Sequence, residues 1–364
     1  MQYFDFHGHK LSRLGLGCMR FPLMGPEQSD VDEEATAKLI DHAIAQGINY
    51  FDTAWAYHGG NSERIMGRML KNYPRCNYYL ATKYPGFSVE NMIDPASIFE
   101  KQLENCQTDY FDFYLCHNVC ERNIDWFTDG QYGVVEYLIE QKKLGRIKYL
   151  GFSTHGSRAV IKRFLNAYGQ ELSFCQIQLN YLDWTLQSAK EKVELLNNYR
   201  LPVWVMEPVR GGRLATLSDE RMELLNSYRP GVKAPEWAFR FLQSIEGVGM
   251  ILSGMSNMEQ LNENIATFSQ EKPLTKQERA TLLRLADDMI AENAVPCTAC
   301  GYCVDHCVQK LPIPELIKAY NEKAEPQGIG PAACIHCRRC ESLCPQGIKI
   351  SEVMTNFAQK LKEK

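Results

Sequence analysis

Short apolar runs alternate with longer amphipathic stretches along most of the chain. The first residues alternate between apolar and polar, turn at Gly8 and resume at Leu11, a pattern that predicts a β-hairpin. Apolar runs of strand length then recur, at about 14–17, 49–51, 78–82, 111–116, 147–151, 174–177, 203–206 and 249–252. Each precedes an amphipathic stretch of helical length, at about 33–46, 61–71, 95–106, 131–143, 157–168, 186–198, 234–244 and 258–268.

Eight strand-helix units within roughly 250 residues predict an α/β protein whose parallel sheet closes into a (β/α)8 TIM barrel. The competing fold, an open doubly wound sheet, requires a glycine-rich phosphate-binding loop after its first strand. Gly15 and Gly17 supply only the first half of that motif. We therefore expect the barrel, preceded by the N-terminal hairpin.

The pattern changes beyond about residue 270. A Lys/Glu-rich amphipathic helix is predicted at about 275–292, and from Cys297 onward we expect short loops rich in cysteine and proline. The domain boundary is placed near residue 290. The chain would then consist of a barrel domain, 1–290, and a small C-terminal domain, 291–364.

Eight of the 14 cysteines lie in this C-terminal domain, in two groups with the spacing C-x2-C-x2-C-x3-C. In the bacterial ferredoxin run with this spacing, three cysteines bind one [4Fe–4S] cluster and the fourth binds the other. Zinc is the weaker alternative, because zinc sites pair two C-x2-C hooks that are a dozen or more residues apart. Crossed ligation predicts one set of Cys297, Cys300, Cys303 and Cys344, and a second set of Cys334, Cys337, Cys340 and Cys307.

The composition and charge of the chain limit the cellular environment and the binding partners that we expect for it. Hydrophobic residues make up 45% and charged residues 23%, enough for a sizeable core. The formal net charge of -4 offers no broad positive field for nucleic acid or anionic lipid. No apolar run is long enough for a membrane span, and the first residues lack the features of a signal peptide. We expect a cytoplasmic protein, which keeps its thiols reduced and binds neither nucleic acid nor membrane.

Reactive side chains stand where successive strands are predicted to end, which is where barrel enzymes carry their catalytic residues. Asp52, Lys83 and His117 end the second, third and fourth runs, and Tyr57 follows in the loop after Asp52. Lys83 is expected to lower the pKa of Tyr57, and Asp52 to keep Lys83 charged. His117 is able to donate a hydrogen bond to a carbonyl oxygen. Each residue alone would be unremarkable in a core or loop, but together they predict a proton-delivery relay.

These residues also match a known family. Residues 51–57, followed by Gly60-Asn61-Ser62-Glu63, resemble the signature of the aldo-keto reductases, as do residues 80–83, 114–117 and 151–153. The resemblance covers about residues 8–270, and with the cysteine tail the chain resembles the branch that carries a C-terminal 2[4Fe–4S] ferredoxin domain. The resemblance implies that Tyr57 is the general acid, that Lys83 and Asp52 adjust the pKa of Tyr57, and that His117 orients the substrate.

The same resemblance implies a nicotinamide cofactor that lies extended across the barrel mouth. Ser153 and Gln176 match positions that hold the carboxamide, Thr154 replaces an asparagine, and Met206 replaces a stacking aromatic ring. Ser256 and Gln260 are uncharged where the family usually binds the 2′-phosphate, so NADPH versus NADH stays open. The other expected contacts are Gly17, Met19 and Arg20, then Pro208, Arg210 and Gly211 at the pyrophosphate, and Ser253, Gly254, Glu263 and Asn264 near the adenosine.

Two functions remain in view. The first is an NAD(P)H-dependent oxidoreductase that reduces an aldehyde or ketone, or oxidises the alcohol, and carries a two-cluster electron-transfer domain. Direct coupling of the hydride to the clusters would need an intermediary, normally a flavin, because a hydride carries two electrons and each cluster accepts one. Such a flavin would come from an external flavoprotein or occupy the nicotinamide cleft, and the clusters would serve an external redox partner or brace the tail. The alternative is a redox-responsive nicotinamide-binding protein that signals to, or exchanges electrons with, a partner protein. The presence of both Tyr57 and Lys83 favours the enzyme.

Overall fold

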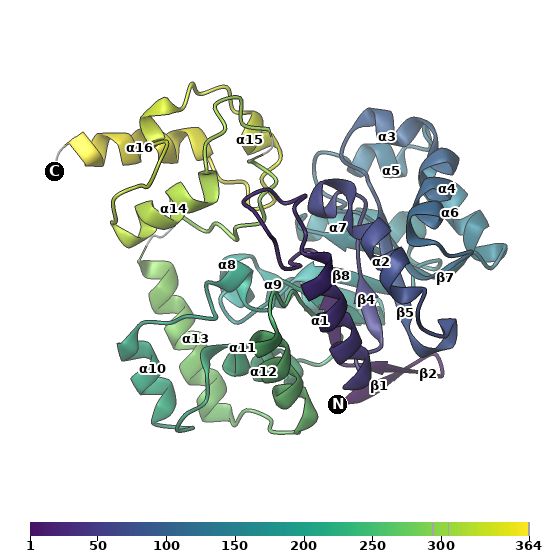
Figure 1. The fold of residues 1–364 in the computed structure, drawn as a ribbon, viewed down its shortest axis with the longest axis horizontal. Helices are drawn as coiled ribbons and strands as arrows, with labels where there is room; N and C mark the ends of the chain where they lie inside the picture. The colour runs from purple at the N-terminus through teal and green to yellow at the C-terminus, as the bar shows by residue number, and fades with distance from the viewer. Residues whose placement is uncertain (293–294, 305, 363–364) are drawn as a thin grey trace. The chain divides into compact units, whose positions relative to one another are not determined.

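The computed structural model describes residues 1–292, 295–304 and 306–362. The chain divides into two compact units (Figure 1). The barrel unit comprises Met1–Pro208 and Pro235–Arg279, and the tail unit comprises Val209–Ala234 and Ala280–Lys364. Among the described residues, no helix has both the length and the apolar character that crossing a membrane requires.

Eight parallel strands form a closed barrel in the order β10-β3-β4-β5-β6-β7-β8-β9, which confirms the (β/α)8 prediction. The strands are β3 (Leu14–Gly17), β4 (Tyr50–Asp52), β5 (Tyr79–Tyr84), β6 (Phe111–Cys116), β7 (Ile147–Thr154), β8 (Phe174–Gln178), β9 (Val203–Met206) and β10 (Val248–Ser253). Because every neighbouring pair is parallel, the C-terminal ends of all these strands meet at one mouth.

The predicted N-terminal hairpin is also present. Strands β1 (Tyr3–Phe6) and β2 (His9–Ser12) pair antiparallel around a turn in which Gly8 has a φ of 83°. Phe4 and Phe6 pack edge-on against Trp204, with ring centroids 5.7 and 5.0 Å apart. Trp204 is the second residue of β9, so the hairpin covers the end of the barrel opposite the mouth.

The helices that follow the strands lie close to their predicted ranges. They are α1 (Glu33–Ala45), α2 (Ser62–Leu70), α4 (Pro95–Cys106), α6 (Val134–Lys143), α7 (Arg158–Tyr168), α9 (Ala189–Asn198), α11 (Ala234–Gln243) and α12 (Met258–Ser269). Asp32 caps α1 and Asn257 caps α12, each by accepting a backbone N–H of the first turn. The short helices α3 (Val89–Ile93), α5 (Ile124–Thr128) and α8 (Asp183–Leu186) lie in loops at the strand ends and were not predicted.

The tail unit contains more helix than the sequence led us to expect. It holds α10 (Asp219–Asn226), most of α13 (Lys276–Ala291), α14 (Ile313–Glu322), α15 (Arg339–Ser342) and α16 (Ile350–Lys362). The expectation of short loops after Cys297 was wrong, because α14 and α16 bury apolar faces around Ile317 and Phe357. Pro314 suggested a loop, but proline is compatible with the first turn of a helix.

Candidate functional site

The ends of β4 and β5 bring three of the predicted catalytic side chains into contact. Lys83 has no exposed surface, and its Nζ donates hydrogen bonds to Asp52 Oδ1 at 2.5 Å and to the Thr53 carbonyl oxygen at 2.7 Å. The same Nζ lies 3.3 Å from the Tyr57 hydroxyl oxygen. Asp52 and Tyr57 are themselves buried. One buried ammonium thus connects a carboxylate to a phenol.

His117 completes the group from the end of β6. Its ring meets the Tyr57 ring edge-on with centroids 6.0 Å apart, and Phe87 packs against its other side at 4.8 Å. Tyr57 begins a 3-10 turn, Tyr57–Gly60, in which His58 has a left-handed backbone with φ 54°. The imidazole of His58 accepts the Phe21 N–H at 3.2 Å, which holds the turn in place. The sequence therefore predicted all four members of the group but not His58 as a support.

The pKa directions at this site follow mainly from burial. Burial raises the pKa of Tyr57 well above its usual value, and the negative charge of Asp52 raises it further. The expectation that Lys83 lowers this pKa was wrong in its net direction, because Asp52 compensates the ammonium charge and burial disfavours the phenolate. Burial lowers the pKa of His117 well below its usual value, so its ring is neutral near pH 7. Burial also raises the pKa of Asp52, while Lys83 opposes this change.

Three buried polar atoms at the mouth have no hydrogen-bond partner within the part of the chain that the structure describes. They are Asp52 Oδ2, His117 Nδ1 and Gln176 Oε1. Buried polar groups in proteins are rarely left unpaired, and unpaired ones often meet a ligand or an ordered water. These three atoms are therefore available for hydrogen bonds to the nicotinamide and the substrate that the sequence predicts at the mouth.

The expected carboxamide contacts lie side by side on neighbouring strands. Ser153 of β7 is in register with Gln176 of β8, and Met206 of β9 is in register with Gln178 of β8. The Thr154 hydroxyl instead donates to the Val119 carbonyl oxygen at 2.6 Å. The Thr154 side chain is thus used within the protein, whereas Gln176 Oε1 has no partner among the described residues. The role of Ser153 and Gln176 at the carboxamide stays a prediction.

Asn118 is a residue at the mouth that the sequence did not suggest. It has a left-handed backbone with φ 52°, and its N–H donates to Ser153 Oγ at 2.9 Å. Its Oδ1 accepts the His155 N–H at 3.1 Å. Asn118 thus ties the end of β6 to the end of β7, and its position directly after His117 was the available signal.

The residues expected after β3 and near the adenosine lie at and beyond two adjacent strand ends, since β3 and β10 are neighbouring strands. Ser256 Oγ donates to the Arg20 carbonyl oxygen at 2.8 Å, and the Ser256 N–H donates to Gln260 Oε1 at 2.8 Å. A Cβ on Gly254 would lie 2.7 Å from Cγ of Arg20. The structure thus brings together two neighbouring segments. The first is the end of β3 and the loop after it, with Gly17, Met19 and Arg20, and the second is the end of β10, the loop after it and α12, with Ser253, Gly254, Ser256, Gln260, Glu263 and Asn264.

The expected pyrophosphate loop crosses from one unit to the other. Pro208 ends the first segment of the barrel unit, whereas Arg210 and Gly211 belong to the tail unit. Arg210 is buried and donates to Gln346 Oε1 at 3.3 Å. Gly211 has φ 61°, and a Cβ there would lie 1.8 Å from the Thr298 carbonyl oxygen. Both residues thus contact segments next to predicted cluster ligands, and their role at the pyrophosphate stays a prediction.

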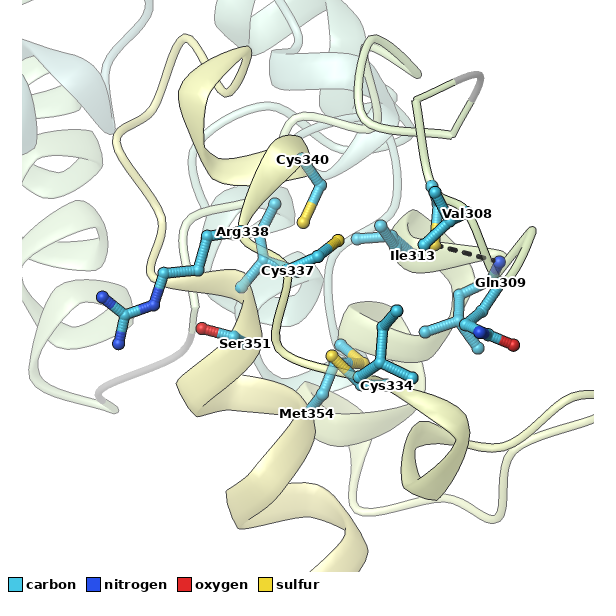
Figure 2. Close-up of a pocket in the computed structure, with 13 residues that line it drawn as sticks. Val308, Gln309, Ile313, Cys334, Cys337, Arg338, Cys340, Ser351 and Met354 are labelled. Carbon is cyan, nitrogen blue, oxygen red and sulfur yellow. Dashed lines mark hydrogen bonds between the residues drawn. The ribbon is translucent and has the colours of Figure 1, made fainter.

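Two cavities in the tail unit are each lined by four cysteines. Cavity 1 is lined by Cys297, Cys300, Cys303 and Cys344. Cavity 2 is lined by Cys307, Cys334, Cys337 and Cys340, and Figure 2 shows three of these around a common space. Ile313 and Ile350 line both cavities. These are the two sets that crossed ligation predicts.

The walls of these cavities suit an iron–sulfur cluster. Within the described ranges, no three or more His, Cys, Asp or Glu side chains form a group that could hold a single metal ion. Each cavity instead offers four separate thiols, as a [4Fe–4S] cluster requires. Backbone N–H groups of Ala299 and Leu311 donate to Cys297 Sγ and Cys307 Sγ, both at 3.4 Å. Such bonds favour the thiolate form in which cysteine binds iron.

A closed parallel barrel with Asp, Tyr, Lys and His at its mouth, joined to a tail with two four-cysteine cavities, defines an oxidoreductase with an iron–sulfur domain. The Aldo/keto reductase family model matches residues 13–287, and the 4Fe-4S dicluster domain model matches residues 296–348. The chain belongs to the aldo/keto reductase family. It is an NAD(P)H-dependent oxidoreductase that carries a 4Fe–4S dicluster domain.

Known relatives resemble the barrel part of the chain. The uncharacterized oxidoreductase YqkF of Bacillus subtilis is 28% identical over 299 residues, 74% of this chain and 90% of that protein. The NADH-specific methylglyoxal reductase of Escherichia coli is 26% identical over 303 residues, 71% of this chain and 90% of that protein. The holo form of aldo-keto reductase AKR11C1 from Bacillus halodurans is 25% identical with a TM-score of 0.64, covering 78% of this chain and 96% of that one.

Proposed function

We propose that this protein reduces an aldehyde or ketone with NAD(P)H, or oxidises the corresponding alcohol, and that Tyr57 is its general acid. The observation that carries the proposal is the position of Lys83. Its fully buried Nζ lies 2.5 Å from Asp52 Oδ1 and 3.3 Å from the Tyr57 hydroxyl. A charge placed in this way favours the loss of a proton from Tyr57 at the moment of reaction, although the resting phenol holds it firmly.

When bound, NAD(P)H supplies the hydride that reduces the carbonyl carbon. Gln176 and the Ser153 hydroxyl would hold its carboxamide, because they lie in register on neighbouring strands and Gln176 Oε1 has no partner among the described residues. Met206 would contact the ring with its thioether. The paired loops after β3 and β10 would hold the adenosine end, with Ser256 and Arg20 fixed to one another.

The proton is supplied from the other side of the site. As negative charge develops on the substrate oxygen, Tyr57 donates its proton to that oxygen and becomes a phenolate. The Lys83 ammonium stabilises the phenolate, and Asp52 keeps Lys83 charged within a buried site. The neutral imidazole of His117 donates an N–H hydrogen bond to the same oxygen and so orients the carbonyl group.

The proposal also assigns a role to the two cysteine cavities. Two [4Fe–4S] clusters would be held by the four cysteines of cavity 1 and the four of cavity 2. When bound, each cluster takes up or releases one electron. Since a hydride carries two electrons, exchange between nicotinamide and clusters would need a flavoprotein or a similar redox partner.

The test is the Tyr57→Phe variant, with Tyr50→Phe as its control. Tyr50 is a buried tyrosine at the start of β4, the strand that precedes the Tyr57 turn, and it packs in the apolar cluster that includes Phe6 of the hairpin, at the opposite end of the barrel from the mouth. Oxidation of NADH and NADPH is followed with a panel of small aldehydes and ketones that includes methylglyoxal, because one relative is a methylglyoxal reductase. We expect Tyr57→Phe to lose about 10²–10⁴ in kcat with unchanged cofactor affinity, and Tyr50→Phe to keep its activity.

Two results would overturn the proposal. Activity of Tyr57→Phe within about twofold of wild type would remove Tyr57 as the acid. Tight binding of NAD(P)H by the wild-type protein without turnover of any carbonyl or alcohol would instead support the alternative, a redox-responsive nicotinamide-binding protein.

A further inference from the structure

The two cysteine cavities differ in how they meet the surface of the tail unit. At cavity 1 every lining residue is buried or half-buried. At cavity 2 the ligand Cys337 is exposed, and so are Val308, Gln309, Ile335 and Arg338 in the lining. Val308 and Ile335 are 48% and 57% exposed, so two apolar residues of the lining lie at the surface together.

This exposed ring around cavity 2 is built from two chain segments. Residues 335–339 are five consecutive exposed positions, and Val308 to Lys310 form a second exposed run. Val308 and Ile335 line the same cavity, so the two segments lie together. Figure 2 shows Arg338 extending away from the thiols. The result is a small surface with an apolar centre next to Cys337, which we call the cavity-2 face and define by Val308, Lys310, Ile335, Arg338 and Arg339.

The charge of this face is opposite to that of the whole chain. Lys310, Arg338 and Arg339 are exposed cations, whereas the chain has a formal net charge of -4. Glu341 is the one acidic residue among the described residues 306–310 and 334–342. Its carboxylate is half-buried and accepts hydrogen bonds from the Ser351 N–H and hydroxyl. Within these two segments the exposed charges are therefore positive.

We propose that the cavity-2 face docks an acidic protein that carries single electrons, and that electrons enter or leave the tail unit through the cluster of cavity 2. This inference rests on the proposed clusters. Electron transfer between proteins uses small, transient interfaces, and opposite charges accelerate the encounter. A small apolar centre with a cationic rim beside an exposed ligand has these properties, and cavity 1 lacks them.

The redox step balances without other reactants. A reduced carrier passes one electron to the oxidised cluster, so that the carrier is oxidised by one electron and the cluster is reduced by one. No bond is made or broken. The reverse transfer occurs when the cluster has the lower potential.

The experiment measures binding of an acidic plant-type [2Fe–2S] ferredoxin to the anaerobically purified, full-length holoprotein. The carrier is labelled with a fluorophore, and its anisotropy is titrated at low and at physiological ionic strength. We expect binding at low salt that weakens steeply as salt is added. A basic cytochrome c, used as the opposite probe, is expected to bind at least tenfold more weakly.

The test variant carries Arg338→Glu and Arg339→Glu, and the control carries Lys318→Glu and Lys323→Glu. The control makes the same change of charge at two exposed positions that line neither cavity, and Lys323 shares the left-handed backbone of Arg338. We expect the test variant to weaken ferredoxin binding at least tenfold and the control to change it less than twofold. Ile335→Ser is expected to weaken binding at all salt concentrations alike, because it removes apolar contact and no charge.

Several outcomes would overturn the inference. These are equal binding by the test variant and wild type, equal weakening by test and control variants, or tighter binding of the cytochrome. Self-association of the wild-type protein that is abolished by Arg338→Glu and Arg339→Glu, without ferredoxin binding, would assign the face to a second copy instead. Iron and sulfide analysis of each protein separates these results from a failure of the proposed clusters, which would appear as missing iron in the wild-type protein itself.

Discussion

The barrel mouth and the tail cavities both gather polar side chains from distant parts of the chain, but they hold them differently. At the mouth, Lys83 already has hydrogen bonds to Asp52 and Thr53. Asp52 and Lys83 lie on β4 and β5, and Tyr57 and His117 follow the ends of β4 and β6. In the tail, Cys307 and Cys344 each leave their own group in the sequence and join the other group's cavity. There the thiols stand around largely apolar walls, and the proposed clusters would hold them together.

This difference separates two kinds of functional site. A site built on strand ends is organised by the fold and is ready before its ligands arrive. A site built from thiols around a cavity is organised largely by its metal, whose binding energy becomes part of the folding energy. Changes to the tail's metal should therefore leave the chemistry of the barrel in place.

The largest expected effect is on iron content. Holoprotein should contain about eight iron and eight sulfide per chain if both clusters form, and loss of one ligand should reduce this to about four. Crossed ligation predicts that Cys307→Ala removes the same cluster as Cys337→Ala, and that Cys344→Ala removes the same cluster as Cys300→Ala. Iron analysis and electron paramagnetic resonance of the reduced variants check this pairing.

In each of these variants, carbonyl reduction by the barrel should stay within about twofold of wild type. If Cys307→Ala gave the same spectrum as Cys300→Ala, each sequence group of four cysteines would bind its own cluster. Loss of carbonyl reduction together with the cluster would show that the two regions are not independent.

A second test compares two adjacent glycines in the tail unit. Gly211→Ala places a Cβ within 1.8 Å of the Thr298 carbonyl oxygen, beside the ligand Cys297, whereas Gly212→Ala meets nothing within 4 Å. Both positions have positive φ, 61° and 98°, so the general backbone strain is shared. We expect Gly211→Ala to lose iron to a chelator several-fold faster than Gly212→Ala. Equal rates would mean that the contact with Thr298 does not support cavity 1.

The third prediction concerns the pH dependence of the barrel. Burial holds the pKa of His117 well below the usual value near 6.5, so the unfolded chain takes up a proton that the folded chain does not. Stability should therefore fall as the pH decreases below about 6.5, by about 1 kcal/mol between pH 6.5 and 5.5 for one histidine. His117→Gln removes this contribution.

Urea unfolding followed by tryptophan fluorescence at both pH values measures the effect. His155, whose pKa is lowered to about 4, is retained in the variant and leaves a smaller decline of the same sign. An identical decline in wild type and His117→Gln would contradict a neutral His117.

The smallest expected effect concerns the absorbance of the clusters, which should not change when nicotinamide is added. NADH or NADPH alone should not bleach the oxidised clusters within seconds, because no group described in either unit converts a hydride into single electrons. Anaerobic, flavin-free protein mixed with excess nucleotide in a stopped-flow instrument gives the measurement. Rapid bleaching without an added flavoprotein would show that the two regions are directly coupled.

Much of both regions was accessible from the sequence. The repeat of apolar runs located β3, β6 and β9 to the residue, and the ends of three strands supplied Asp52, Lys83 and His117. In the tail, helices α14 and α16 were missed although each carries an apolar face, because the neighbouring prolines and cysteines were interpreted as a sign of loops. Asn118 and His58 were also missed, because each accepts a hydrogen bond from the backbone of a distant segment, His155 and Phe21, and such contacts are set only by the fold.

The sequence by itself determined the barrel, the identity of the four reactive residues and the two sets of cysteines, since periodicity and spacing are properties of the chain. The tertiary structure decided the direction in which the pKa of Tyr57 shifts. It also placed Arg210 and Gly211 in the tail unit and left cavity 2, rather than cavity 1, lined by exposed residues. Each of these depends on how much water is excluded around a group and on which distant segments pack against it. Those quantities exist only once the chain has folded.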